Sequence, residues 1–326
     1  MWAAAAADGR TWRRRAGRTP QASTQLLLQQ LPKSPRCSLE WDKRSAVCPA
    51  LGATAFLVVL SSPSTGPVQT PVLSIYDQLL RVRHARGAGF VVLIDPDKLP
   101  ASRLPAFAER CAQAGTDAFF LGGSLLDAHD LESYVEMLKS ATDLPVIGFP
   151  GNVTQVVRGL DAVLFLSIVS GRNPEYLIGQ HVHAAPLVRR LGVEPIPTAY
   201  LLVESGRTTT AQYMSGSAPL PRHKPDIAAA TALAAEMLGM RLLFTDAGSG
   251  ADHAVPEESI SAITSVCTAP LVVGGGLRTP EAVAAKVAAG ASFVVVGNAL
   301  EKRPDGAYMD DLAAAAHSTS RVGATR

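Results

Sequence analysis

The fold is decided by one stretch, Leu271-Val272-Val273-Gly274-Gly275-Gly276-Leu277-Arg278-Thr279-Pro280, and by a second run about twenty residues later, Phe293-Val294-Val295-Val296-Gly297-Asn298. Each is a β-branched run that stops on glycine before a helix-forming segment, so the pair predicts two consecutive strand–loop–helix units. Glycine at a strand end lets backbone N–H groups approach an anion, and the next helix turns its positive dipole end toward the same place. Barrels of eight parallel strands bind phosphate in the loops after their last two strands. The repeat therefore favours a phosphate site over two ordinary turns.

A regular alternation of strand and helix patterns precedes these two units. An amphipathic segment over 75–86 comes first, and a helix over 308–317 closes the pattern. Eight strand–helix units in about 230 residues predict an α/β fold, a (β/α)8 TIM barrel. A doubly wound open sheet is the alternative, although no Gly-x-Gly-x-x-Gly follows the first strand. The six earlier strands are expected over 89–94, 117–121, 145–148, 162–167, 194–203 and 241–245.

Residues 1–71 differ in composition from the rest of the chain. They carry nine Lys/Arg against three Asp/Glu, whereas residues 72–326 carry twenty-one against twenty-five. We interpret 1–71 as a disordered basic extension or a misassigned start, 72–317 as the barrel domain and 318–326 as a flexible tail. A mildly acidic barrel gives no support to nucleic-acid binding.

Cysteine usage and hydropathy indicate the compartment. The four cysteines, at positions 37, 48, 111 and 267, form no CxxC pair and show no metal-ligand spacing. No apolar run approaches the roughly 20 residues that a membrane span needs. We therefore expect a reduced, cytoplasmic protein.

Functional side chains of such barrels collect at the carboxyl ends of the strands. Asp95 and Asp97 follow the first strand and Ser124 the second, whereas glycines follow the last three. This division predicts two phosphorylated groups, one held through Mg²⁺ and one by backbone amides. Mg²⁺ prefers one or two carboxylates plus substrate phosphates, so Asp95 with Ser124 or Asp97 supplies a suitable partial shell. The competing interpretation of Asp-Pro-Asp is a turn that caps the helix near Ala101.

Seven motifs occur in order along residues 72–317: Leu93-Ile94-Asp95-Pro96-Asp97-Lys98, Gly122-Gly123-Ser124, Gly148-Phe149-Pro150-Gly151, Tyr200 through Glu204-Ser205-Gly206, Asp246-Ala247-Gly248-Ser249-Gly250, Val273-Gly274-Gly275-Gly276 and Val296-Gly297-Asn298. Their combination closely resembles the geranylgeranylglyceryl phosphate synthase family. It is more similar to the longer, group II branch, which has the Asp-Ala-Gly-Ser-Gly insertion. The leader has no counterpart in that family.

The resemblance implies a prenyltransferase. The C3 hydroxyl of sn-glycerol 1-phosphate would attack C1 of geranylgeranyl diphosphate, forming an ether and releasing diphosphate. It also implies that Asp95 and Ser124 hold Mg²⁺ on the diphosphate. The lipid substrate makes peripheral membrane contact an expectation, and we expect a homo-oligomer. The residues implied for the glycerol phosphate are Tyr200, Leu201, Leu202, Val203, Glu204, Ser205, Gly206, Gly248, Ser249, Gly274, Gly275, Gly297 and Asn298.

Glu204 and Tyr200 are the candidate catalytic residues. A carboxylate within reach of the C3 hydroxyl would take its proton, so Glu204 is the candidate general base. The family often spaces its glutamate two residues after the tyrosine, whereas Glu204 comes four after Tyr200. We expect His181 and His183, two apart on a predicted helix, to lie on the helix surface. The anion contacts expected outside the motifs are Arg172 and Arg207.

Three alternatives stay open. The same reaction with a C35 prenyl diphosphate would use the same motifs. A phosphosugar isomerase or aldolase would share the glycine loops but would place a lysine or histidine at a strand end, where Lys98 is the only nearby lysine. A catalytically silent barrel that binds lipid phosphates is the third alternative, and the intact acidic residues argue against it.

Overall fold

A computed structural model describes residues 73–127, 130–303 and 306–317. The chain divides into two units, Met1–Val68 and Gln69–Arg326, and the second holds all described residues. The extension predicted over 1–71 and the tail predicted over 318–326 lie outside the described residues.

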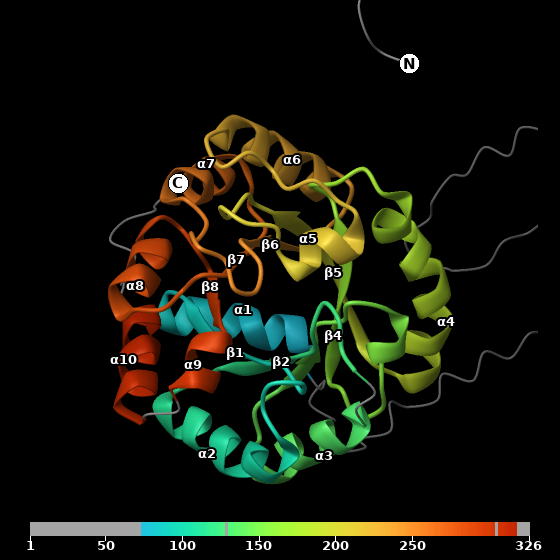
Figure 1. The fold of residues 1–326 in the computed structure, drawn as a ribbon, viewed down its shortest axis with the longest axis vertical. Coiled ribbons are helices and arrows are strands. Elements are labelled where there is room, and N and C mark those ends of the chain that lie inside the picture. Colours follow the sequence, from blue (N-terminus) through green and yellow to red (C-terminus); the bar gives the residue numbers. More distant parts are fainter. Residues whose placement is uncertain (1–72, 128–129, 304–305, 318–326) are drawn as a thin grey trace, which may run out of the picture. The chain divides into compact units, whose positions relative to one another are not determined.

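Eight parallel strands close into one barrel in chain order (Figure 1). Closure is made by β8, which pairs with both β7 and β1. The predicted TIM barrel is thus confirmed, and the six earlier strands begin and end within one residue of their predicted bounds. The strands are β1 Gly89–Ile94, β2 Ala118–Leu121, β3 Val146–Gly148, β4 Ala162–Ile168, β5 Glu194–Leu202, β6 Leu242–Asp246, β7 Leu271–Gly274 and β8 Phe293–Val296.

Helices surround the barrel (Figure 1). Their ends follow local sequence signals: Thr279 caps α8 by accepting a hydrogen bond from the Ala282 N–H, and Pro280 occupies the first turn. Among the described residues, no helix has the length and apolarity that crossing a membrane requires. The outer helices are α2 Leu104–Ala114, α3 Leu131–Ala141, α4 Gln180–Leu191, α6 Pro225–Met237, α7 Glu257–Val266, α8 Pro280–Ala288 and α10 Gly306–His317. The remaining helices are α1 Ile75–Arg86, η1 Ala101–Arg103, η2 Val153–Gln155, the π-helix η3 Glu175–Gly179, α5 Thr210–Ser215 and α9 Asn298–Lys302.

Alternation along the strands separates two apolar cores. Outward side chains such as Phe90 and Phe119 pack under the helices, while inward ones such as Val91, Phe120 and Phe293 fill the barrel, all at most 1% exposed. This two-sided burial explains why the strands read as continuous apolar runs.

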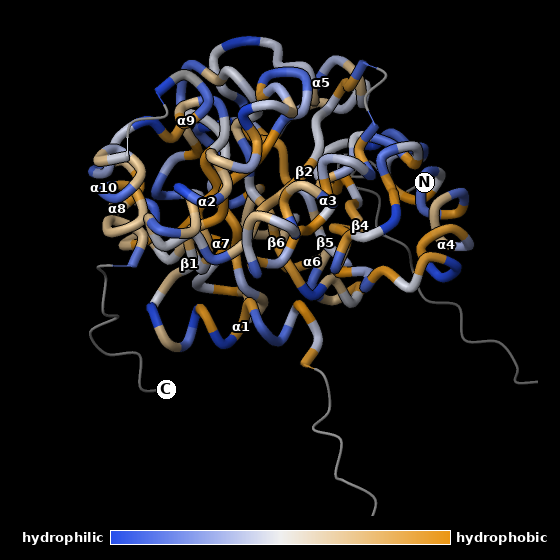
Figure 2. Tube along the Cα trace, turned by 90° about the horizontal axis from the view of Figure 1, so that it is seen from below, coloured by the Kyte–Doolittle hydropathy of each residue, from blue (hydrophilic) through white to orange (hydrophobic). Residues whose placement is uncertain are grey.

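Helix α1 closes the amino end of the barrel, opposite α5 and α9 (Figure 2). Tyr76 and Leu79 join the inner core. The Glu194 carboxylate accepts hydrogen bonds from the N–H groups of Ile75 at 2.6 Å and Tyr76 at 3.1 Å, and the Arg241 guanidinium lies 4.0 Å from the centre of the Tyr76 ring. Because this end is closed, the carboxyl end is left for the site.

Candidate active site

A cavity of about 500 Å³ lies at the carboxyl end of the barrel, bordered by segments that follow seven of the strands. Its wall is made largely of glycines and polar residues. Nine of the residues predicted to form the site line it: Asp95, Ser124, Tyr200, Gly248, Ser249, Gly274, Gly275, Gly297 and Asn298.

Three glycine-bearing loops, after β6, β7 and β8, meet on one side of this cavity. Gly275 has φ +78°, and a Cβ there would lie 2.5 Å from Asp246 Oδ1 and 2.8 Å from the Gly248 nitrogen, so only glycine fits. The loops after β6 and β8 are joined by a 2.9 Å hydrogen bond from Asn298 Nδ2 to Ser249 Oγ. Arg278 lines the same cavity and adds a positive charge. The arrangement suits a phosphate group.

A buried tyrosine–aspartate pair, Tyr200 and Asp246, lines the polar cavity. The Tyr200 hydroxyl donates to Asp246 Oδ2 at 2.6 Å, and the Gly248 N–H donates to Asp246 Oδ1 at 2.8 Å. Burial raises the pKa of Asp246, against the opposing effect of these two hydrogen bonds. Burial, together with the neighbouring carboxylate, raises the pKa of Tyr200. The pair is therefore equipped to accept a proton.

The β5–β6 register explains why sequence reasoning missed this pair. Asp246 stands at a predicted strand end, but Tyr200 was associated only with Glu204 through their closeness in the chain. In the barrel, Tyr200 faces Phe244 and Leu202 faces Asp246 across the two strands, which brings side chains 46 residues apart into contact. The sequence signal that could have predicted this pair is a tyrosine and an aspartate near the ends of two neighbouring predicted strands.

The acidic side of the cavity is formed by the loop after β1. Asp95 Oδ1 accepts a hydrogen bond from the Asp97 N–H at 3.1 Å, and Asp95 Oδ2 is paired with Lys98 Nζ. The helix cap considered for Asp-Pro-Asp is absent, because Pro100 occupies the cap position of η1 without a side-chain hydrogen bond. Among the described ranges of the chain, no group of three or more His, Cys, Asp or Glu could hold a metal ion. A cation at this loop would therefore take fewer than three of its ligands from such side chains of the described residues.

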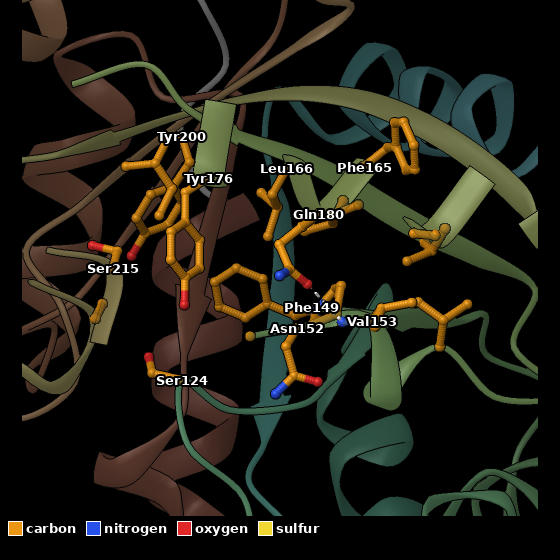
Figure 3. A pocket seen from close by; sticks show the side chains of 18 of the residues that line it. Ser124, Phe149, Asn152, Val153, Phe165, Leu166, Tyr176, Gln180, Tyr200 and Ser215 are labelled. Atoms are coloured by element: carbon orange, nitrogen blue, oxygen red, sulfur yellow. Dashed lines mark hydrogen bonds between the residues drawn. The ribbon is translucent and has the colours of Figure 1, made fainter. Parts of the chain in front are cut away.

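A second cavity, of about 100 Å³, is predominantly apolar and runs between β4, η3, α4 and α5 (Figure 3). Phe165, Leu166 and Val153 are among its walls, and Ala184 of α4 presents the smallest side chain that this helix contributes to it. The two cavities meet, because both are lined by Gly123, Ser124, Phe149, Tyr200 and Ala211.

Glu204 and its neighbours lie apart from both cavities. Glu204 is exposed, and its carboxylate is 3.5 Å from the Arg222 nitrogen, which donates to it. Leu201, Leu202 and Val203 are buried at the end of β5, and neither these nor Ser205 and Gly206 are among the residues that line the two cavities.

The expectation that His181 lies on a helix surface is wrong. His181 is 8% exposed and lines the apolar cavity, its Nε2 is 3.2 Å from Ser167 Oγ, and its ring packs edge-on at 4.5 Å from Phe165. Burial lowers its pKa. His181 shares the buried face of α4 with Ala184 and Val188, three and seven residues further on, which is ordinary helical spacing. His183 is exposed, as expected.

The two arginines expected to contact anions are bound elsewhere. Arg172 Nη1 donates to the Gly171 carbonyl at 2.7 Å, and Arg207 forms a 3.0 Å ion pair with Asp252. Neither lines either cavity.

Known proteins are similar to this chain in sequence and in fold. The model of the PcrB family matches residues 80–316. The geranylgeranylglyceryl phosphate synthase of Chitinophaga pinensis is 46% identical over 241 residues, which are 74% of this chain and 95% of that relative. The enzyme of the same name from Methanothermobacter marburgensis is 43% identical over 211 residues, 65% of this chain and 85% of its own.

A solved structure agrees with these relatives. The crystal structure of (S)-3-O-geranylgeranylglyceryl phosphate synthase from Thermoplasma acidophilum, in complex with its substrate sn-glycerol-1-phosphate, superposes with a TM-score of 0.72 at 31% identity, covering 76% of this chain and 100% of that one. The chain therefore belongs to the PcrB family, together with the geranylgeranylglyceryl phosphate synthases.

Proposed function

We propose that the protein joins the C3 hydroxyl of sn-glycerol 1-phosphate to C1 of a prenyl diphosphate, forming an ether and releasing diphosphate. The observation that carries the proposal is the junction of two cavities of opposite character, one walled by glycine loops and acids and one apolar. A substrate with a charged head and a hydrocarbon tail needs both. The names of the relatives and the substrate of the Thermoplasma acidophilum enzyme support the same reaction.

The glycerol phosphate is assigned to the side of the three glycine loops. Its phosphate accepts hydrogen bonds from backbone N–H groups near Gly248, Gly275 and Gly297, and Arg278 balances part of its charge. The closeness of Gly275 to the Asp246 carboxylate supports this assignment, because it sets the phosphate loop directly beside the proton acceptor.

Asp246, acting with Tyr200, replaces Glu204 as the proposed general base. The 2.6 Å hydrogen bond allows the Tyr200 oxygen to accept the hydroxyl proton while its own proton passes to Asp246. Because burial raises the pKa of Asp246, its carboxylate is a better proton acceptor than an exposed one. The exposed Glu204 has neither this environment nor a place in the cavity wall.

The diphosphate is assigned to the side of Asp95 and Ser124. A Mg²⁺ ion that takes most of its ligands from phosphate oxygens and water would need only one or two protein oxygens, which Asp95 and Ser124, with Asp97 in the same wall, would supply. When bound, the ion would neutralise charge on the leaving diphosphate. Lys98, which is paired with Asp95, adds a positive charge beside the proposed diphosphate position.

The apolar cavity is assigned to the prenyl tail. We propose C20 as its chain length, with C35 as the alternative. Each buried methylene contributes about 0.8 kcal/mol, so the depth of this cavity decides the preference. The phosphosugar alternative has less support, since the cavity lysine is paired with Asp95 and none of the described residues lining the polar cavity is a histidine.

Surface side chains support the proposed oligomer and membrane contact. Ile178 and Val182, one helical turn apart, are 60% and 65% exposed on the outside of η3 and α4, a patch suited to a second copy. Met214, 41% exposed, lines the apolar cavity, and the next residue in the chain on its amino side, Tyr213, is 80% exposed; both suit contact with a lipid surface.

The test is direct. Purified protein, labelled sn-glycerol 1-phosphate, geranylgeranyl diphosphate and Mg²⁺ should yield a labelled ether extractable into organic solvent. If no label enters the organic phase at any protein concentration, the proposed function is wrong. Light scattering of the same sample should give a mass above that of one chain.

A further inference from the structure

We infer that Phe149 is a catalytic residue: its aromatic face stabilises the positive charge that develops on the allylic carbon during prenyl transfer. This inference rests on the proposed function and adds a residue to its chemistry. It follows from where the two cavities meet.

The junction fixes the position of the reacting carbon. A prenyl diphosphate has its charged group in the polar cavity and its tail in the apolar one, so C1 and the adjacent double bond lie where the cavities join. Only two of the five shared lining residues, Phe149 and Tyr200, are aromatic. The Tyr200 hydroxyl is hydrogen-bonded to Asp246 and is assigned to proton transfer, so Phe149 is the aromatic ring at the junction that has no other assigned role.

The ring of Phe149 is held rigidly. It stacks on Phe244 with centroids 5.2 Å apart and an interplanar angle of 19°, and the rings of Tyr200 and Phe120 lie 6.1 Å and 6.0 Å away. The Phe149 N–H donates to the Leu121 carbonyl at 2.8 Å. Phe244 stacks against one face of this half-buried ring, and Phe149 itself lines both cavities. Such fixed groups need no reorganisation during the reaction.

Prenyl transfer develops a positive charge on the allylic carbons, and this charge needs stabilisation where the two cavities meet. The bond between C1 and the diphosphate oxygen breaks, and its electron pair leaves with the diphosphate. Positive charge then spreads over C1 and C3 of the allylic group until the glycerol C3 oxygen donates an electron pair to C1. The hydroxyl proton passes to the Tyr200–Asp246 pair. A ring face attracts this cation but not the neutral alkene, so the interaction acts on the transition state alone.

The test replaces Phe149 by mono-, di- and trifluorophenylalanine, introduced by amber suppression. Fluorine withdraws electron density from the ring face and changes its size little, so the fold is kept. We expect kcat for ether formation to fall stepwise along the series while KM for the prenyl diphosphate stays nearly constant. Phe149→Leu should lower kcat about thirtyfold, equivalent to about 2 kcal/mol at 1.36 kcal/mol per tenfold.

Phe120 provides the matched control. Its ring lies 6.0 Å from Phe149 and is 1% exposed, but it lines neither cavity. The same fluorinated series at Phe120 should leave kcat unchanged. Equal kcat along the Phe149 series in an active enzyme would overturn the inference and leave the proposed function standing. Absence of transfer by the unsubstituted protein would overturn both.

Discussion

Replacing Asp246 by asparagine removes the proposed base with almost no change in volume. Asp246 accepts two hydrogen bonds, from the Tyr200 hydroxyl at 2.6 Å and the Gly248 N–H at 2.8 Å. Asparagine has only one acceptor oxygen, so one of these donors loses its partner. Loss of a general base alone lowers turnover by about a hundredfold to ten-thousandfold. We expect kcat of Asp246→Asn to fall at least about a hundredfold.

The stability of this variant separates catalysis from folding. The folded-state pKa of Asp246 is raised, so its contribution to stability is present below the unfolded-state pKa and is lost as pH rises through the folded-state value. Neutral asparagine avoids the cost of a buried charge at pH 7, which offsets the lost hydrogen bond. We expect the Tm to change by less than about 4 °C, or roughly 1 kcal/mol.

The assay measures initial rates of labelled ether formation across substrate concentrations, with thermal melts of the same samples. Glu204→Gln is the matched control: this side chain is exposed and lines neither cavity, so its kcat should stay within about threefold of the unsubstituted enzyme, an effect below 1 kcal/mol. A near-normal rate for Asp246→Asn, together with a hundredfold loss for Glu204→Gln, would refute the reasoning.

Three further predictions concern the metal, the tail and the pH dependence of stability. Asp95→Asn should lower turnover at least about a hundredfold, and excess chelator should stop turnover; full activity in chelator would exclude the metal. Ala184→Trp should fill the apolar cavity and move the substrate preference toward shorter prenyl chains, whereas Ala185→Trp, at an exposed position, should leave the preference unchanged. An unchanged product profile in a folded Ala184→Trp variant would show that the prenyl tail does not bind in this cavity. The pKa of Glu236 is subject to a rise from burial but lies below its usual value because Thr268 and the Ala269 N–H donate to its carboxylate. Glu236→Gln should therefore lower the Tm at pH 7, and the difference should vanish as pH falls through the lowered pKa; a difference independent of pH would contradict this.

Most strands were predictable because they are short, apolar and bounded by glycine or polar residues; β5, with nine residues that begin Glu194-Pro195-Ile196-Pro197, is the exception. The strand-end rule then gave Asp95, Ser124 and the glycines of the last three loops, all of which line the polar cavity. Their roles remain predictions. The helices were harder to predict from the sequence. Helix α5 lies in a segment whose composition is typical of a loop, and the π-helix η3 and helix α4 together occupy what the sequence predicts as one helix.

Contacts between distant segments were the part that sequence could not supply. Tyr200 and Asp246 meet because of the β5–β6 register, and Phe149 becomes part of a junction only when two cavities converge on it. Glu204 is expected near the C3 hydroxyl as a carboxylate four residues after Tyr200, a spacing that an unbroken strand would place on one face. The regular strand β5 ends at Leu202, so this alternation does not extend to Glu204. His181 is buried because it lies on the same face of α4 as Ala184 and Val188, a spacing that the sequence does contain.

The most direct test of the central claim is a competition assay. The protein is given labelled sn-glycerol 1-phosphate and equal amounts of C15, C20 and C35 prenyl diphosphates, and the labelled ethers are separated by chain length. We expect one dominant C20 ether, and no labelled ether when labelled sn-glycerol 3-phosphate replaces its enantiomer. A dominant C35 ether would correct the tail and keep the reaction, whereas label in none of the three ethers would contradict the claim that this barrel is a prenyltransferase.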